Sequence, residues 1–152
     1  MRAKRTIAVT AALLGLTAMT VSPASAAAGS WKAYGNTNPI TSSPHKWVCA
    51  GSKSIATDVL AQVCVIRSSS GGSVQGAVIV RNNRSSGFST TATVDLWTRD
   101  RGQLGIWDCP SSGVALKSWS VCFGRSQSVP SSDPANSVGW ARDVYLGVTG
   151  LV

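Results

Sequence analysis

The chain has 152 residues, with 14 lysines and arginines against six aspartates and no glutamate, which gives a formal charge of +8. This length suits one domain with a single modest core. The basic residues are scattered, so they do not form the concentrated basic face of a nucleic-acid-binding protein. A metal site is equally disfavoured, because no Cys-x-x-Cys pair occurs and His45 is the only histidine.

Residues 1–26 have the three parts of a secretory signal peptide. Basic residues lie between positions 2 and 5, an apolar run spans 7–21, and small residues at 24–26 form the cleavage site. The apolar run is too short and too interrupted for a membrane anchor. We therefore expect a secreted protein that begins at Ala27. Its charge would be +5, because cleavage removes three basic residues and no acidic one.

Residues 27–45 are rich in Gly, Asn, Ser, Thr and Pro and lack apolar periodicity. This composition predicts an extended, flexible N-terminal arm rather than a packed element. Trp31 and Tyr34 surround one cation, Lys32, in this polar segment. A flexible segment with aromatic anchors can order on a partner, so these three residues are candidate partner-binding residues. The alternative is a disordered terminus without a role.

Residues 46–152 predict strands and no convincing helix. The clearest strand spans 88–98, where apolar and polar residues alternate with a period of two. Seven short strands separated by turns predict an all-β antiparallel β-sandwich of the immunoglobulin-like type. The expected strands are 46–50, 59–67, 74–81, 88–98, 104–109, 114–123 and 138–148. We expect a hairpin turn at 110–113, and an inward set of Val138, Trp140, Val144, Leu146 and Val148 in the last strand.

Four cysteines, Cys49, Cys64, Cys109 and Cys122, fit an exported protein with two disulfides. Three pairings are possible. We favour Cys49–Cys64 and Cys109–Cys122, because these pairs close the shortest loops. Each bond would stabilise the fold by about 3 kcal/mol.

The sequence offers no convincing catalytic set. The aspartates fall mostly beside turns or on polar strand faces, as turn chemistry explains. Serine is abundant, but no Gly-x-Ser-x-Gly elbow occurs, and no orienting partner is suggested for His45. We therefore expect a protein that is not an enzyme and that uses no cofactor or metal.

Trp97 is the second candidate for partner binding. It falls on the polar face of its predicted strand, beside Asp95 and Arg99. An exposed aromatic side chain on a sheet can stack on a sugar ring or anchor a protein partner. The alternative is that a loop or the opposite sheet edge covers it.

The signal peptide, the arm with Trp31 and Tyr34, and the four-cysteine domain resemble small secreted β-proteins of filamentous actinobacteria. In layout the chain is similar to the adaptor subunit of the umbrella toxin particles. This resemblance implies that residues 27–35 reach into a lectin-type subunit, while the globular domain attaches to the repeat-built ring of the large toxin chain.

The expected function is therefore a secreted, non-enzymatic adaptor that links other secreted proteins, without nucleic-acid or membrane partners. Two alternatives stay open. One is a carbohydrate- or cell-wall-binding module that uses Trp97 or Trp107. The other is a secreted protease inhibitor that presents the loop at 125–136.

Overall fold

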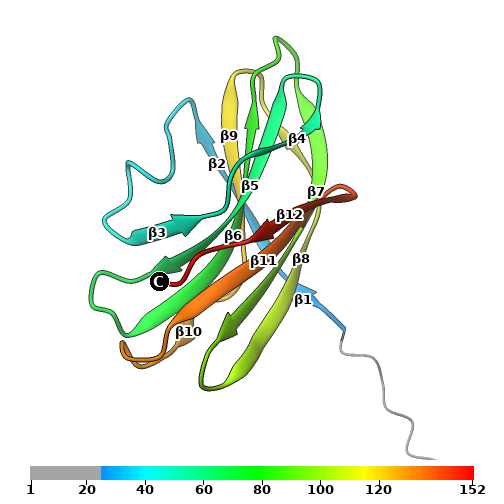
Figure 1. Ribbon diagram of the computed structural model, residues 1–152. Helices are drawn as coiled ribbons and strands as arrows, with labels where there is room; N and C mark the ends of the chain where they lie inside the picture. Colours follow the sequence, from blue (N-terminus) through cyan, green and yellow to red (C-terminus); the bar gives the residue numbers. More distant parts are fainter. Residues whose placement is uncertain (1–24) are drawn as a thin grey trace, which may run out of the picture.

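The computed structural model describes residues 25–152, and these residues form two β-sheets packed face to face (Figure 1). The strands are β1 (Ala27–Ala28), β2 (Ser30–Gly35), β3 (Lys46–Cys49), β4 (Lys53–Ala56), β5 (Val59–Arg67), β6 (Ser73–Asn82), β7 (Phe88–Thr98), β8 (Gly102–Val114), β9 (Ser118–Phe123), β10 (Gln127–Ser128), β11 (Ala135–Ala141) and β12 (Val144–Val148). The predicted signal peptide lies outside the described residues, apart from Ser25 and Ala26. No helix among residues 25–152 is long and apolar enough to cross a membrane.

Sheet A has the strand order β1-β8-β7-β11-β12, and sheet B has the order β2-β9-β6-β5-β3. Two short strands extend sheet B, because β10 pairs with β6 and β4 pairs with β5. All pairs are antiparallel except β1 with β8. These observations confirm the predicted all-β antiparallel sandwich.

The main core lies between the two sheets and consists largely of β-branched residues. Along β5, Val59, Val63 and Val65 are fully buried. The neighbouring strand β6 adds Val78, which pairs with Val63, and Val80. Side chains alternate between the faces of a strand, so one set per strand faces this core. Its fully buried members include Val59, Val63, Val65, Val74, Val78, Val80, Val94, Leu96 and Leu146.

The inner face of β11 carries only small residues, and this corrects the predicted inward set. A Cβ atom on Gly139 would lie 2.8 Å from the Val63 side chain of sheet B, so the sheets approach too closely for a larger residue. The inward positions are therefore Ala135, Ser137, Gly139 and Ala141. Val138 and Trp140 face outward instead, and of the predicted set Leu146 alone is fully buried.

Both predicted disulfides are confirmed, but one of them has a different structural role. Cys49–Cys64 links the neighbouring strands β3 and β5. Cys109–Cys122 links β8 of sheet A to β9 of sheet B, as the buried disulfide of antibody domains links their two sheets.

The predicted hairpin between 104–109 and 114–123 is therefore wrong, because its two strands belong to different sheets. Residues 110–113 lie inside β8 rather than in a turn. The register with β7 shifts between Thr90 and Ala92, opposite Pro110 and Ser111. Proline has no N–H to donate, so it suits such a bulge within a strand.

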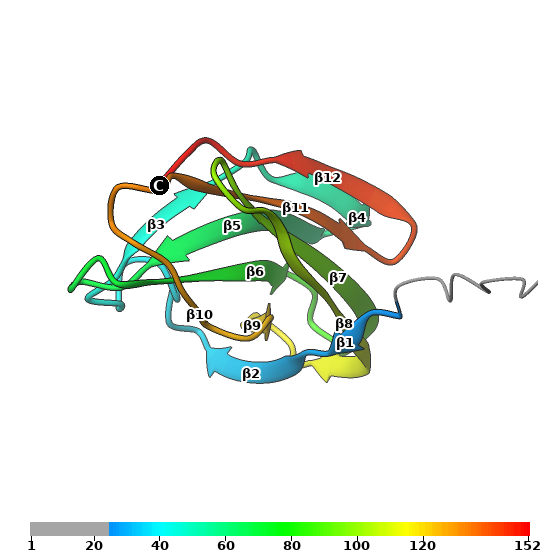
Figure 2. The same ribbon diagram turned by 90° about the horizontal axis from the view of Figure 1, so that it is seen from below.

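The N-terminal segment is extended, as predicted, but it is paired rather than flexible. β2 runs antiparallel to β9 along one edge of sheet B (Figure 2). Trp31 packs against the main core, and Gly29 lies so close to the disulfide that a Cβ atom would be 2.7 Å from Cys109 Sγ. The loop that follows covers the outer face of sheet B, where Tyr34 and Ile40 pack on a second, smaller cluster.

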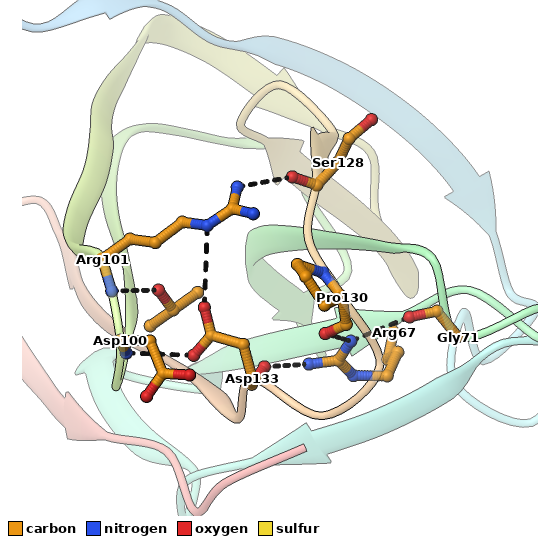
Figure 3. Close-up of polar contacts among 8 residues, drawn as sticks. Arg67, Gly71, Asp100, Arg101, Ser128, Pro130 and Asp133 are labelled. Atoms are coloured by element: carbon orange, nitrogen blue, oxygen red, sulfur yellow. Dashed lines mark hydrogen bonds and ion pairs between the residues drawn. The ribbon is translucent and has the colours of Figure 1, made fainter.

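Arg67, the buried last residue of β5, joins several loops at one end of the sandwich, and Figure 3 shows its contacts. The Arg67 guanidinium donates hydrogen bonds to the backbone oxygens of Gly71, Pro130, Asp133 and Val152. The Asp133 carboxylate accepts a hydrogen bond from the Asp100 N–H and lies 3.9 Å from Arg101 Nε. This network ties three loops and the C-terminal residues together.

Candidate interaction surface

The outer face of sheet A carries exposed apolar side chains from neighbouring strands. Trp97 of β7 lies opposite Asn136 of β11, and Val138 of β11 lies opposite Val148 of β12. Trp97 is 38% exposed, Val148 49% and Leu151 53%. These residues line a shallow, open depression of about 480 Å³.

Aromatic side chains extend this surface along the same sheet. Trp140 of β11 pairs with Tyr145 of β12, and their ring centroids are 5.5 Å apart. Lys53 Nζ lies 5.4 Å from the centroid of the Tyr145 ring and donates a hydrogen bond to the Tyr145 backbone oxygen. We call the residues Trp97, Val138, Trp140, Tyr145, Val148 and Leu151 the sheet A surface.

Two pairs of polar side chains on the outer face of sheet A are hydrogen-bonded to each other. Gln103 Nε2 donates to both carboxylate oxygens of Asp95, at 3.0 Å each. Thr93 Oγ1 donates to Asp108 Oδ1 at 2.7 Å. A partner that covered these groups would not break their hydrogen bonds, so burying them would cost less free energy.

The structure separates the four residues that the sequence analysis assigned to partner binding. Trp97 is exposed on the outer face of sheet A, as its position on a polar strand face suggests, whereas Trp107, the other tryptophan considered for glycan binding, is buried in the main core. Trp31 instead packs against the main core, and its Nε1–H donates to the Pro110 backbone oxygen at 2.7 Å. Lys32 and Tyr34 lie near the free edge of sheet B, with Lys32 Nζ 5.1 Å from the centre of the Tyr34 ring.

Most of the sheet A surface escaped the sequence analysis. Val138, Trp140 and Val148 were expected in the core, because apolar residues on an alternating strand usually face inward. The available signal was the alternation of Ala, Ser, Gly and Ala with larger residues in β11. Small residues at every second position indicate a close approach on that side.

The described part of the chain contains no group of three or more His, Cys, Asp or Glu side chains that could hold a metal ion. The Nδ1 atom of His45 accepts a hydrogen bond from the Ser69 N–H at 3.3 Å. Comparisons with protein-family models, curated proteins and solved structures find no match.

Proposed function

We propose that the protein is a secreted, non-enzymatic binding protein that joins two other proteins. The observation that carries the proposal is the sheet A surface, on which Trp97, Tyr145, Val148 and Leu151 are each at least 38% exposed. Contiguous exposed apolar patches indicate interaction sites. Tryptophan and tyrosine are also enriched where protein interfaces are energetically strongest.

A second contact would use the opposite sheet. Within the described residues β2 has one neighbour, β9, so its other edge offers backbone groups to an added strand. Lys32 and Tyr34 lie on this edge strand. Because the two surfaces belong to opposite sheets, one molecule could hold two partners at once, which is the property an adaptor needs.

In this arrangement the N-terminal segment acts in place, as an edge strand. Insertion of residues 27–35 into a partner would break the pairing of β2 with β9 and would remove Trp31 from the core. In an assembly of the toxin type, the partners would be a lectin-type subunit and a large toxin chain. The two disulfides support secretion, because such bonds persist in oxidising compartments.

Two double variants test the proposal. Partners that copurify with the full-length protein from culture medium would be identified, and their affinities measured by surface plasmon resonance. The double change Trp97→Ala with Val148→Ser should lower the affinity for one partner by about thirtyfold, as expected on loss of an aromatic anchor that contributes about 2 kcal/mol. The double change Lys32→Ala with Tyr34→Ala should lower the affinity for a different partner.

Arg125→Gln provides the control, because Arg125 is exposed and lies outside both surfaces. Loss of the same partner in both double variants would contradict the two-surface arrangement. Unchanged affinities in both would reject the proposal.

Carbohydrate binding is the second candidate for the sheet A surface. The Trp97 ring lies opposite Asn136 on the neighbouring strand, and the Asn136 side-chain amide could bond sugar hydroxyls. Titration with chitin and cellulose fragments would then quench tryptophan fluorescence in the natural chain and not in Trp97→Ala.

A further inference from the structure

Three turns meet at one end of the sandwich, the upper end in Figure 1. Hydrogen bonds join them, because the Asn83 N–H donates to the Asp58 backbone oxygen and the Lys117 N–H donates to that of Arg84. Between them lies an open, polar pocket of about 470 Å³. Its lining includes Thr57, Asp58, Arg84, Ser85, Ser86 and Lys117. We call it the turn pocket.

The two cations of the turn pocket are held in place by backbone oxygens. Arg84 Nε donates to the Thr57 oxygen at 2.8 Å, and the guanidinium carbon lies 5.0 Å from the centre of the Phe88 ring. Lys117 Nζ donates to the Asn83 oxygen. Among the described contacts, both terminal amino groups of Arg84 and two N–H groups of Lys117 remain available to a ligand.

Neither Arg84 nor Lys117 forms an ion pair with a carboxylate, and the described lining holds these two cations against one carboxylate, Asp58. Across residues 25–152 one ion pair is within 4.0 Å, and it joins Arg101 to Asp133 elsewhere in the molecule. A third cation, Arg142, adds to the local potential, since its guanidinium carbon lies 5.7 Å from the same Phe88 ring. Fixed charges of one sign in a concave site attract a ligand of the opposite sign.

Backbone strain occurs in two of these turns and in the turn between β11 and β12. Asp58, Lys117 and Arg142 have φ values of 57°, 49° and 52°, and they are the non-glycine residues with positive φ in the described chain. Glycine adopts this conformation without steric cost, and aspartate tolerates it better than lysine or arginine does. In the turn pocket, Lys117 therefore places a cation where glycine would adopt the backbone conformation more easily, and such strain is concentrated at functional sites.

We propose that the turn pocket binds a phosphate group. Arg84 would supply a bidentate pair of donors to two phosphate oxygens, which its planar fork matches. Lys117 would supply a third donor, and the hydroxyls of Ser85 and Ser86 would complete the set. The Asp58 carboxylate on the rim opposes binding, so the site favours an anion of low total charge. The proposal is independent of the sheet A surface.

NMR titration of the full-length mature protein with sodium phosphate, at ionic strength held constant with sodium chloride, tests the proposal. Saturable shifts should be centred on Arg84, Ser85, Ser86 and Lys117. Arg84→Gln should weaken binding by about tenfold, as expected on loss of charge-assisted hydrogen bonds. Asp58→Asn should strengthen it, and the control Arg125→Gln should leave it unchanged.

Lys117→Gly separates a binding role from a structural one. Glycine relieves the strain at φ 49°, so the variant should melt at the same or a higher temperature while its phosphate affinity falls by about tenfold. A fall in melting temperature with unchanged phosphate affinity would overturn the proposal. So would linear, non-saturating shifts, or equal losses in Arg84→Gln and Arg125→Gln.

Dimethyl phosphate, titrated in the same way, identifies the source of the phosphate group. Binding of both compounds would assign the pocket to a phosphodiester of a larger polymer. Binding of inorganic phosphate alone would assign it to a phosphate monoester. If neither compound bound, the proposal would be rejected.

Discussion

At the residue scale, Gly139 sets how closely β11 can approach sheet B. A Cβ atom there would lie 2.8 Å from Val63 and 3.1 Å from Val78 Cγ2, and both valines are fully buried. Gly139→Ala should therefore lower the free energy of unfolding by about 1–3 kcal/mol, as overpacking does. Urea denaturation measures the change. Gly113→Ala, where a Cβ atom would have no neighbour within 4 Å, is the matched control and should be nearly neutral.

The Arg67 side chain makes a second residue-scale contribution, which is structural. Its guanidinium satisfies four backbone oxygens from separate parts of the chain. Arg67→Met would leave these oxygens without that donor, so we expect a loss of about 3 kcal/mol in unfolding free energy. Arg101→Gln should cost less than about 1 kcal/mol, because the Arg101 side chain is 50% exposed. Equal losses in the two variants would contradict this role.

At the element scale, β2 completes sheet B. Its removal would leave β9 paired with β6 alone, expose the other edge of β9 and take Trp31 away from the core. Deletion of residues 27–35 should therefore lower the melting temperature and promote association, because free strand edges pair with other chains. Differential scanning calorimetry and size-exclusion chromatography measure the two effects. An unchanged melting temperature would restore the flexible-arm interpretation.

Period-two alternation predicts a strand correctly where one face of the strand packs in the core and the other faces solvent. The strand at 88–98 was recovered as β7 with its bounds unchanged. β2 escaped prediction because only Trp31 and Tyr34 in it are partly buried, and a register shift between Ala33 and Gly35 breaks the period of two. β11 was predicted with its faces reversed, since its core side is limited to small residues by the opposite sheet. The exposure of Trp97 could be predicted from its place on a polar strand face. The rest of the sheet A surface and the turn pocket depend on contacts between residues that are far apart in the sequence.

At the scale of the whole molecule, one disulfide joins two strands of the same sheet and the other joins the two sheets. Cys49–Cys64 lies within sheet B, and Cys49 is partly exposed. Cys109–Cys122 crosses the core between the sheets, with its cysteines 1% and 0% exposed. A reductant reaches the first bond through local motion. It reaches the second only when β1 and β2 detach or the sheets separate.

Reduction under native conditions should therefore proceed in a fixed order. With a mild thiol, Cys49–Cys64 should open first, and Cys109–Cys122 should open at a rate set by large-scale unfolding. Timed alkylation followed by peptide mass spectrometry distinguishes the two pairs. Urea well below the unfolding midpoint should accelerate the second reaction much more than the first, because it raises the population of opened molecules. Equal acceleration would mean that the two sheets separate without global unfolding, and that the inter-sheet bond lies in a locally mobile part of the fold.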